Sequence, residues 1–211
     1  MKAHSERVPG KNMRYFNGRP LFHWILESLT KSEVISEIII NTDSDEIAES
    51  ALKNFNVTIH MRPDNLLDIH SNEAYQIMSY DLKNTRGEHF LQSHSTNPLL
   101  KPETINAAVE KYLSCLDKYD SLFTVTPLFT RLYDNNGDPI NHNPHNLIKT
   151  QDLLPVYEEN SCIYIFNRTC FFKNKNRIGS NPYLYPIDRY EAVDIDEEFD
   201  FLNAECIGKN I

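Results

Sequence analysis

The chain has 211 residues, of which 40% are hydrophobic, and this predicts one sizeable core and a single domain over residues 1–211. Its formal net charge of −9 at pH 7 argues against a surface for nucleic acid or an anionic membrane. The sequence has no apolar run of membrane-spanning length and no apolar signal region at its start. Its cysteines form no Cys-x-x-Cys pair, so we expect neither zinc nor a disulfide framework. A cytoplasmic protein without nucleic-acid or membrane partners is predicted.

Helical and extended patterns alternate along the chain. Apolar residues recur at helical spacing from Leu21 to Leu29, directly after a proline that suits a first helical turn. The β-branched run Ile38-Ile39-Ile40 is typical of a strand buried on both faces. Helices are predicted at residues 20–31, 46–55, 72–82, 102–116 and 197–206. Extended segments are predicted at residues 34–41, 57–60, 88–92, 121–126, 161–167 and 183–186. The alternation predicts an α/β fold with a parallel sheet covered by helices.

Residues 127–155 differ in character from the segments on either side. Asn, His and Pro dominate there, and Asn135-Asn136-Gly137-Asp138-Pro139 is a turn signal. A strand pattern resumes at residues 161–167. We therefore interpret the segment as an insertion in the domain rather than a linker between two domains.

The loop at residues 4–12, His-Ser-Glu-Arg-Val-Pro-Gly-Lys-Asn, places Arg7 and Lys11 on either side of a Pro-Gly turn. Such a loop offers backbone N–H groups and two fixed cations to a polyphosphate. Pro-Gly is also a common turn dipeptide, and Arg and Lys are usually solvated. Taken alone, the loop favours a plain surface turn, and the polyphosphate reading stays open.

Asp194 and Asp196 are separated by one residue on a segment that reads as extended, so both carboxylates are expected on one side of the chain. Mg²⁺ takes few protein oxygens and completes its shell with water and phosphate. The pair also fits the acids that precede and begin a helix, which need no metal. Both interpretations remain open from these residues. A second acidic pair, Asp43 with Asp45, fits helix capping.

The segments, in this order, resemble the acylneuraminate cytidylyltransferase family of CMP-sialate synthetases and their relatives. The stretches that carry the resemblance are Ser5-Glu6-Arg7-Val8-Pro9-Gly10-Lys11-Asn12, Asn41-Thr42-Asp43-Ser44-Asp45-Glu46-Ile47-Ala48-Glu49, Arg62-Pro63, Leu91-Gln92 with Asn97-Pro98-Leu99, Asn160 with Ile163-Tyr164-Ile165, and Val193-Asp194-Ile195-Asp196. Each stretch is weak alone, but together they cover nearly the whole chain in the family's order.

The resemblance implies a Rossmann-like, three-layer α/β/α nucleotidyltransferase fold with a mostly parallel sheet. It implies Mg²⁺-dependent transfer of CMP from CTP to the anomeric hydroxyl of a sialic-acid-like sugar acid (nonulosonic or another 3-deoxy keto acid), with release of pyrophosphate. In such a reaction catalysis is mainly positioning and charge neutralisation. The segment at about 127–160 is implied to pair two subunits, so a homodimer is expected.

The same resemblance assigns roles by position. It implies four catalytic residues: Arg7, Lys11, Asp194 and Asp196. Arg7 and Lys11 would bind the CTP phosphates, and Asp194 and Asp196 would bind Mg²⁺. The implied substrate-binding residues are Ser5 and Asn12 in the loop, Arg62 with Ser71 or Asn72 at the cytidine, and Gln92, Asn160 and Tyr164 at the sugar acid. Tyr164 fits a core position equally well.

Three departures from the family pattern stand out. The family begins with an apolar strand ahead of the phosphate loop, and this chain begins almost inside that loop. The segment after Gln92 is longer than the family's pattern, and Glu158-Glu159 stands where many members carry Arg-Pro. Two expectations remain open: either Arg131 or Lys149 replaces that cation, or the substrate is a sugar acid other than a common sialic acid. The alternative function is a truncated, catalytically weak homologue that binds nucleotide or a partner.

Overall fold

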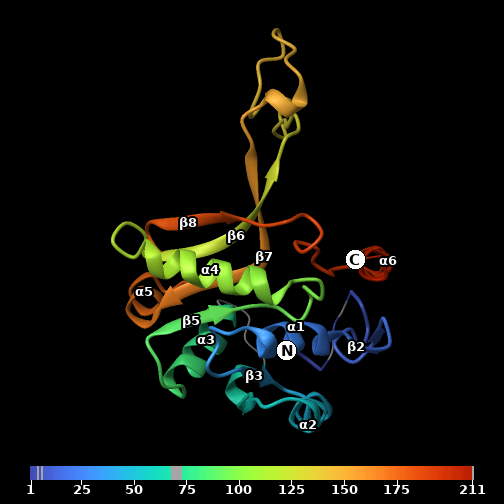
Figure 1. The fold of residues 1–211 in the computed structure, drawn as a ribbon, viewed down its shortest axis with the longest axis vertical. Helices are drawn as coiled ribbons and strands as arrows, with labels where there is room; N and C mark the ends of the chain where they lie inside the picture. The colour runs from blue at the N-terminus through green and yellow to red at the C-terminus, as the bar shows by residue number, and fades with distance from the viewer. Residues whose placement is uncertain (4, 6, 68–72, 211) are drawn as a thin grey trace.

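The computed structural model describes residues 1–3, 5, 7–67 and 73–210. Its helices are α1 (Leu21–Lys31), α2 (Asp45–Asn54), α3 (Glu73–Lys83), α4 (Pro102–Ser114), α5 (Arg168–Asn174) and α6 (Glu198–Gly208), with short 3₁₀ turns η1 (Asp64–Leu66) and η2 (Thr150–Asp152). Its strands are β1 (Tyr15–Phe16), β2 (Arg19–Pro20), β3 (Ile39–Thr42), β4 (Thr58–Met61), β5 (His89–Gln92), β6 (Ser121–Leu128), β7 (Val156–Asn167) and β8 (Pro182–Pro186). Helix and strand alternate much as the sequence predicts (Figure 1). No helix of the described residues is long and apolar enough to cross a membrane.

The strands form a mixed arrangement rather than the mostly parallel sheet that the resemblance implies. β3 pairs with β4 in parallel, and a second sheet has the order β5-β7-β6-β8. In that sheet β7 is antiparallel to both β5 and β6, and only β6 and β8 are parallel. The reason is the connection: β6 returns directly as β7 through a long hairpin, and strands joined in that way run antiparallel.

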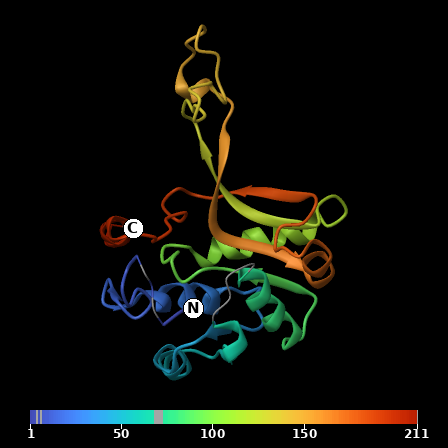
Figure 2. The same cartoon turned by 180° about the vertical axis from the view of Figure 1, so that it is seen from behind.

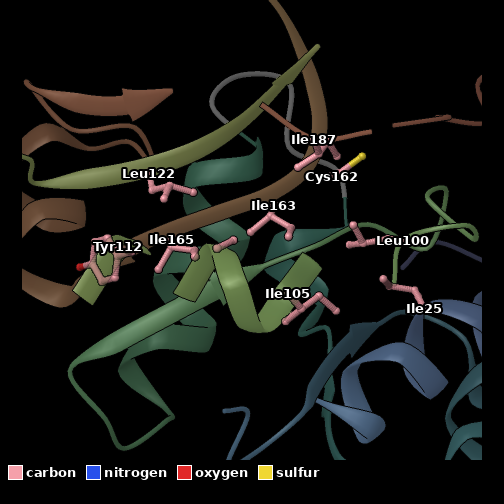
Figure 3. Close-up of a cluster of buried hydrophobic side chains, with 10 residues drawn as sticks. Ile25, Leu100, Ile105, Tyr112, Leu122, Cys162, Ile163, Ile165 and Ile187 are labelled. Carbon is pink, nitrogen blue, oxygen red and sulfur yellow. The ribbon is translucent and has the colours of Figure 1, made fainter. Parts of the chain in front are cut away.

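Helices cover both faces of these sheets. On one face, α1 and α4 pack on β6 and β7, and Figure 3 shows Leu122, Ile163 and Ile165 of the strands meeting Ile105 and Tyr112 of α4. On the other face, Tyr164 and Phe166 of β7 pack against residues of α3 and α5. Successive residues of β7 therefore point to opposite faces, as a central strand requires. The described chain has the three layers of an α/β/α domain.

Local signals explain several of the boundaries. The Ser44 side chain accepts a hydrogen bond from the Ile47 N–H (3.3 Å), which caps α2 as predicted. Helix α5 was not predicted because it has only seven residues, too few for an apolar period. Its signals are instead Asn167, which accepts from the Cys170 N–H (2.7 Å) at the first turn, and Lys175, which ends the helix with a left-handed φ of 51°.

The predicted insertion is an arm that projects from the body of the molecule (Figures 1 and 2). Its base is the outer part of the β6–β7 ladder, where residues 125–128 pair with residues 156–159 beyond an irregularity in register. Ser161, at that irregularity, has a φ of 59°, an unusual value for a residue with a side chain. The insertion is therefore continuous with the central sheet.

Substitution in the core between α4 and the sheet tests this packing. Ile165 is 2% exposed within the cluster of Figure 3, so Ile165→Ala is expected to lower the free energy of unfolding by about 2–5 kcal/mol. The matched control is Leu113→Ala, since Leu113 lies on the outer side of α4 and is 49% exposed; its effect is expected to stay within about 0.5 kcal/mol. Urea denaturation measures both, and equal losses would contradict the described layer.

Candidate functional site

The loop that carries the two predicted phosphate-binding cations is a compact turn. Gly10 has a φ of 62°, and its carbonyl accepts hydrogen bonds from the N–H groups of Met13 and Arg14, each at 3.0 Å. Val8 is fully buried at the start of the turn, and its N–H donates to Ser5 Oγ at 3.4 Å. The buried valine fixes the loop to the body, and the turn holds Arg7 and Lys11 on its outer side.

The two carboxylates of the C-terminal segment lie against this loop. Ile195, between them, is fully buried, and its N–H donates to the Thr96 carbonyl at 3.0 Å. Lys11 Nζ donates to the Ile195 carbonyl at 2.5 Å. Arg7 pairs with Asp196 Oδ1 at 2.6 Å. The structure therefore brings together Arg7, Lys11, Asp194 and Asp196, from opposite ends of the chain.

In this group, burial disfavours the charged forms of both Asp194 and Lys11. Burial raises the pKa of Asp194, and the charge of Asp196 adds to that effect, while a hydrogen bond with Thr96 opposes it. Burial lowers the pKa of Lys11, although Asp196 and Asp194 act in the opposite direction. Desolvated charges of both signs are held close together. Such a site gains from a ligand that carries negative oxygens or a cation that the carboxylates bind.

The donor set can be tested against a metal ion. The described residues contain no cluster of three or more His, Cys, Asp or Glu side chains placed to hold one. Asp194 Oδ1, however, is buried without a hydrogen-bond partner in the described part of the chain. An orphaned carboxylate oxygen beside a second carboxylate fits a cation such as Mg²⁺, which takes its other ligands from water and phosphate.

A second polar group lies at the end of β5. Arg177 donates to Gln92 Oε1 at 3.0 Å and lies 3.2 Å from His94 Nε2. Its guanidinium carbon is 3.5 Å from the centroid of the Tyr164 ring. The Tyr164 hydroxyl donates to Glu159, and Arg177 also lies 3.8 Å from that carboxylate. Arg177 was not predicted, because it lies in the loop between α5 and β8 and no pattern of spacing marks it.

His94 and its neighbours connect the two groups. Burial lowers the pKa of His94 to about 4, and the charge of Arg177 contributes, so the imidazole is neutral near pH 7 and accepts from the guanidinium, which only donates. One residue further, Ser95 Oγ donates to Asn12 Oδ1 at 2.7 Å, and the Thr96 carbonyl accepts from Ile195. The segment after β5 thus connects Arg177 with the loop that carries Arg7 and Lys11.

Two other predicted residues are engaged inside the fold. The Asn160 side chain bonds Thr124 Oγ1 at 2.6 Å, Thr126 Oγ1 at 3.1 Å and the Cys162 N–H at 3.3 Å. It therefore joins β6 to β7 at the irregular register. Tyr164 is fully buried, and only its hydroxyl reaches the Arg177 group.

The predicted cytidine contacts are described only in part. Arg62, at the end of β4, is buried and donates to Asn41 Oδ1 at 3.0 Å, with Asp43 3.6 Å away. Ser71 and Asn72 lie outside the described residues. The ends of β3, β4 and β5 carry the residues of this region, and in open α/β sheets ligands bind beyond such carboxyl ends.

Arg131 and Lys149, the two residues considered as substitutes for the cation missing at Glu158-Glu159, both lie in the arm. Arg131 donates to the Ile148 carbonyl at 2.6 Å within the arm, and Lys149 is exposed there. Arg177 instead supplies a cation next to Glu159 and Gln92. The positive charge next to Glu159 therefore comes from a loop residue that the sequence pattern did not mark.

Comparisons with known proteins agree on one family. A family model described as cytidylyltransferase matches residues 1–210. The pseudaminic acid cytidylyltransferase of Campylobacter jejuni subsp. jejuni is 25% identical over 215 residues, covering 97% of this chain and 92% of that protein. The CMP-N,N'-diacetyllegionaminic acid synthase of Legionella pneumophila subsp. pneumophila is 28% identical over 221 residues, covering 97% and 91%.

A solved structure has a similar fold. It is that of CMP:2-keto-3-deoxy-manno-octonic acid synthetase complexed with CTP, which superposes with a TM-score of 0.71 at 11% identity and covers 100% of this chain and 96% of that one. The likeness extends over all three layers. With a family match that spans nearly its whole length, this chain belongs to the cytidylyltransferase family and is a nucleotidyltransferase.

Proposed function

We propose that this protein transfers CMP from CTP to the anomeric hydroxyl of a sialic-acid-like sugar acid, nonulosonic or another 3-deoxy keto acid, and releases pyrophosphate. The observation that carries the proposal is the meeting of a loop with two cations and a segment with two carboxylates, next to the Gln92–Arg177 pair. The names of two relatives specify pseudaminic and legionaminic acids, and the similar solved structure contains CTP.

Arg7 and Lys11 would bind the phosphates of CTP. The Arg7–Asp196 ion pair is half-exposed, with 60% of the Arg7 and 49% of the Asp196 side chain accessible. Such a pair contributes only about 0–1 kcal/mol, so a phosphate readily replaces the carboxylate as the partner of Arg7. Lys11 is held by the Ile195 carbonyl and would add a second positive charge at a fixed position.

Asp194 and Asp196 would hold Mg²⁺ against the same phosphates. When bound, the ion neutralises charge on the phosphate oxygens and makes the attacking hydroxyl more acidic. Release of Asp196 from Arg7 would free one carboxylate for this role while Asp194 Oδ1 is already unpaired in the described residues. Arg7 and Asp196 would therefore give up their mutual ion pair when the nucleotide and the ion bind.

The sugar acid would lie against Gln92 and Arg177. The Tyr164 ring and Gln92 fix the plane of the guanidinium, and a planar guanidinium matches a carboxylate by two parallel hydrogen bonds. The Tyr164 ring belongs to the core, and its hydroxyl would reach the ligand only by giving up its hydrogen bond to Glu159. In this arrangement the acid's hydroxyl would point toward the α-phosphate held by the loop, which is the positioning that this chemistry needs.

A homodimer formed through the arm fits the same proposal. The arm carries exposed apolar side chains, among them Leu147 (78% exposed) and Leu154 (84% exposed). Several exposed apolar side chains on one projecting segment are the kind of surface that a protein interface covers. The proposed partner is a second copy of this chain.

The central test is product formation from CTP, Mg²⁺ and a panel of 3-deoxy keto-acid sugars. We expect pyrophosphate and a CMP-sugar with one or a few acids, and a loss of about 100-fold or more in kcat for Asp194→Asn, because a neutral amide no longer binds the metal. Asp117→Asn is the matched control, since Asp117 is exposed after α4, and its activity should be unchanged. No product with any acid would overturn the proposal and favour a nucleotide-binding homologue without activity.

Arg177→Gln should weaken binding of the sugar acid specifically. We expect KM for the acid to rise about 10- to 100-fold, which corresponds to loss of a charge-assisted pair, while KM for CTP changes less than about twofold. Arg177→Lys is expected to recover part of the loss. Arg189→Gln, at an exposed position, provides the control. An equal rise in both KM values would show that Arg177 only supports the fold.

Interface substitutions on the arm test the dimer. Leu147→Ser combined with Leu154→Ser should convert a dimer to a monomer in analytical ultracentrifugation, because the exposed apolar surface that pairs the copies is removed. The control is Leu52→Ser on α2, where Leu52 is 59% exposed far along the chain from the arm. A wild-type protein that sediments as a monomer at all concentrations would contradict the proposed homodimer.

A further inference from the structure

An irregularity in β7 turns the side chain of Glu159 toward Arg177, whose guanidinium lies 3.8 Å away. Between Glu159 and Tyr164, β7 has residues 160–163 where β6 has only Thr124. In a regular strand, side chains separated by an odd number of positions point to opposite faces. Here, however, the Tyr164 hydroxyl donates a hydrogen bond to Glu159 Oε1. The irregularity therefore brings the two side chains onto one face, and bulges commonly re-aim a side chain in this way.

The irregular segment is fixed by its own contacts. The buried Asn160 side chain accepts a hydrogen bond from Thr124 Oγ1 at 2.6 Å. Ser161 has a φ of 59°, and its Oγ lies 3.3 Å from the Tyr164 hydroxyl. A residue with a side chain keeps such a φ only where the surrounding structure imposes it, and residues of this kind cluster at functional sites. The direction of Glu159 is therefore set by the fold.

The Tyr164 hydroxyl, rather than Arg177, orients the carboxylate of Glu159. Burial raises the pKa of Tyr164 to about 12, and the hydrogen bond with Glu159 adds to that effect, so the phenol keeps its proton near pH 7 and donates it. The distance of 3.8 Å between Arg177 Nη2 and Glu159 Oε1 is too long for a hydrogen bond. Both contacts of the carboxylate with described side chains use Oε1, and the Glu159 side chain is 45% exposed. Oε2 is therefore open to a ligand.

Arg177 presents an unused donor beside this oxygen. Its hydrogen bond to Gln92 and its contact with His94 both involve Nη1. Nη2 makes no hydrogen bond to the described residues, and the Arg177 side chain is 20% exposed. A cationic donor and an anionic acceptor thus lie next to each other where the sugar acid is proposed to bind.

We infer that Glu159 determines which sugar acids the protein accepts, by taking a hydrogen bond from a hydroxyl or acylamino N–H close to the acid's carboxylate. The inference rests on the proposed function, in which Arg177 binds that carboxylate. A carboxylate only accepts hydrogen bonds, so a ligand group that contacts Oε2 must donate one. A second anionic group at this position is repelled, and a group without a donor leaves Oε2 without the water that it loses on binding. The substrate class is therefore a sugar acid with a neutral donor group beside its carboxylate.

The test compares sugar acids that differ in a single donor. The probes are pseudaminic acid, N,N'-diacetyllegionaminic acid and 2-keto-3-deoxy-manno-octonic acid, each beside analogues in which one hydroxyl or acylamino group is replaced by hydrogen. With the wild type, at least one analogue of the tightest-binding acid should bind about 10- to 100-fold more weakly than its parent. The group removed in that analogue identifies the donor as O–H or N–H. Calorimetric titration in CTP and EDTA gives the dissociation constants, and turnover is measured separately with Mg²⁺.

Substitution of Glu159 should remove this discrimination. Glu159→Leu has no acceptor, so the analogue and its parent should bind within about threefold of each other. Glu159→Gln keeps a neutral acceptor in a side chain of the same size and should show an intermediate ratio. Glu158→Leu is the matched control, because Glu158 is the exposed preceding residue of the same ladder and its side chain points to the opposite face. The control should keep the wild-type ratio.

The outcomes separate this inference from the proposed function. If Glu159 only supports Arg177, its variants will weaken binding of every acid and analogue equally, and unchanged ratios of this kind would overturn the inference. A wild type that binds every analogue as tightly as its parent would overturn it as well. The expected ratios without any CMP-sugar formed would overturn the proposed function and leave this inference standing. Absence of binding of any acid would overturn both.

Discussion

The packing of Val8 and Ile195 in one buried cluster holds the candidate site together. Both side chains are fully buried, and burial of one such side chain contributes about 1.5–3 kcal/mol. The Arg7–Asp196 ion pair joins the same segments but is half-exposed and contributes about 1 kcal/mol at most. Apolar packing therefore fixes the loop against the C-terminal segment. The charged groups are left free to change partners, as the proposed phosphate site requires.

The charge distribution of the chain follows from this arrangement. A protein with a net charge of −9 needs local cations to attract a polyphosphate. Arg7 and Lys11 supply them at the carboxylate pair, and Arg177 supplies another at the end of β5. Arg7 is held by the Asp196 carboxylate and Lys11 by the Ile195 carbonyl. Arg177 is held by the Gln92 amide and the face of the Tyr164 ring. The cations are thus positioned before any ligand binds, which lowers the entropic cost of binding.

Much of the fold could be predicted from the sequence, because its signals are local. The apolar period of α1 and the Ser44 cap of α2 each act within a few residues, and the family resemblance is confirmed over residues 1–210. The antiparallel direction of β7 could not be predicted from periodicity, since it depends on how the arm returns. Arg177 was missed for a similar reason: its contacts with Gln92 and Tyr164 form only after β5, β7 and the loop before β8 have packed together.

A crystal structure with CTP and Mn²⁺ would test the proposed site directly, because Mn²⁺ substitutes for Mg²⁺ and is located by its anomalous scattering. We expect an anomalous peak within coordination distance of Asp194 and Asp196, about 2.0–2.3 Å, with the phosphates between the metal and Lys11. Arg7 should then contact a phosphate rather than Asp196. A nucleotide bound away from the loop, or a metal peak remote from both carboxylates, would show that these residues do not form the CTP site.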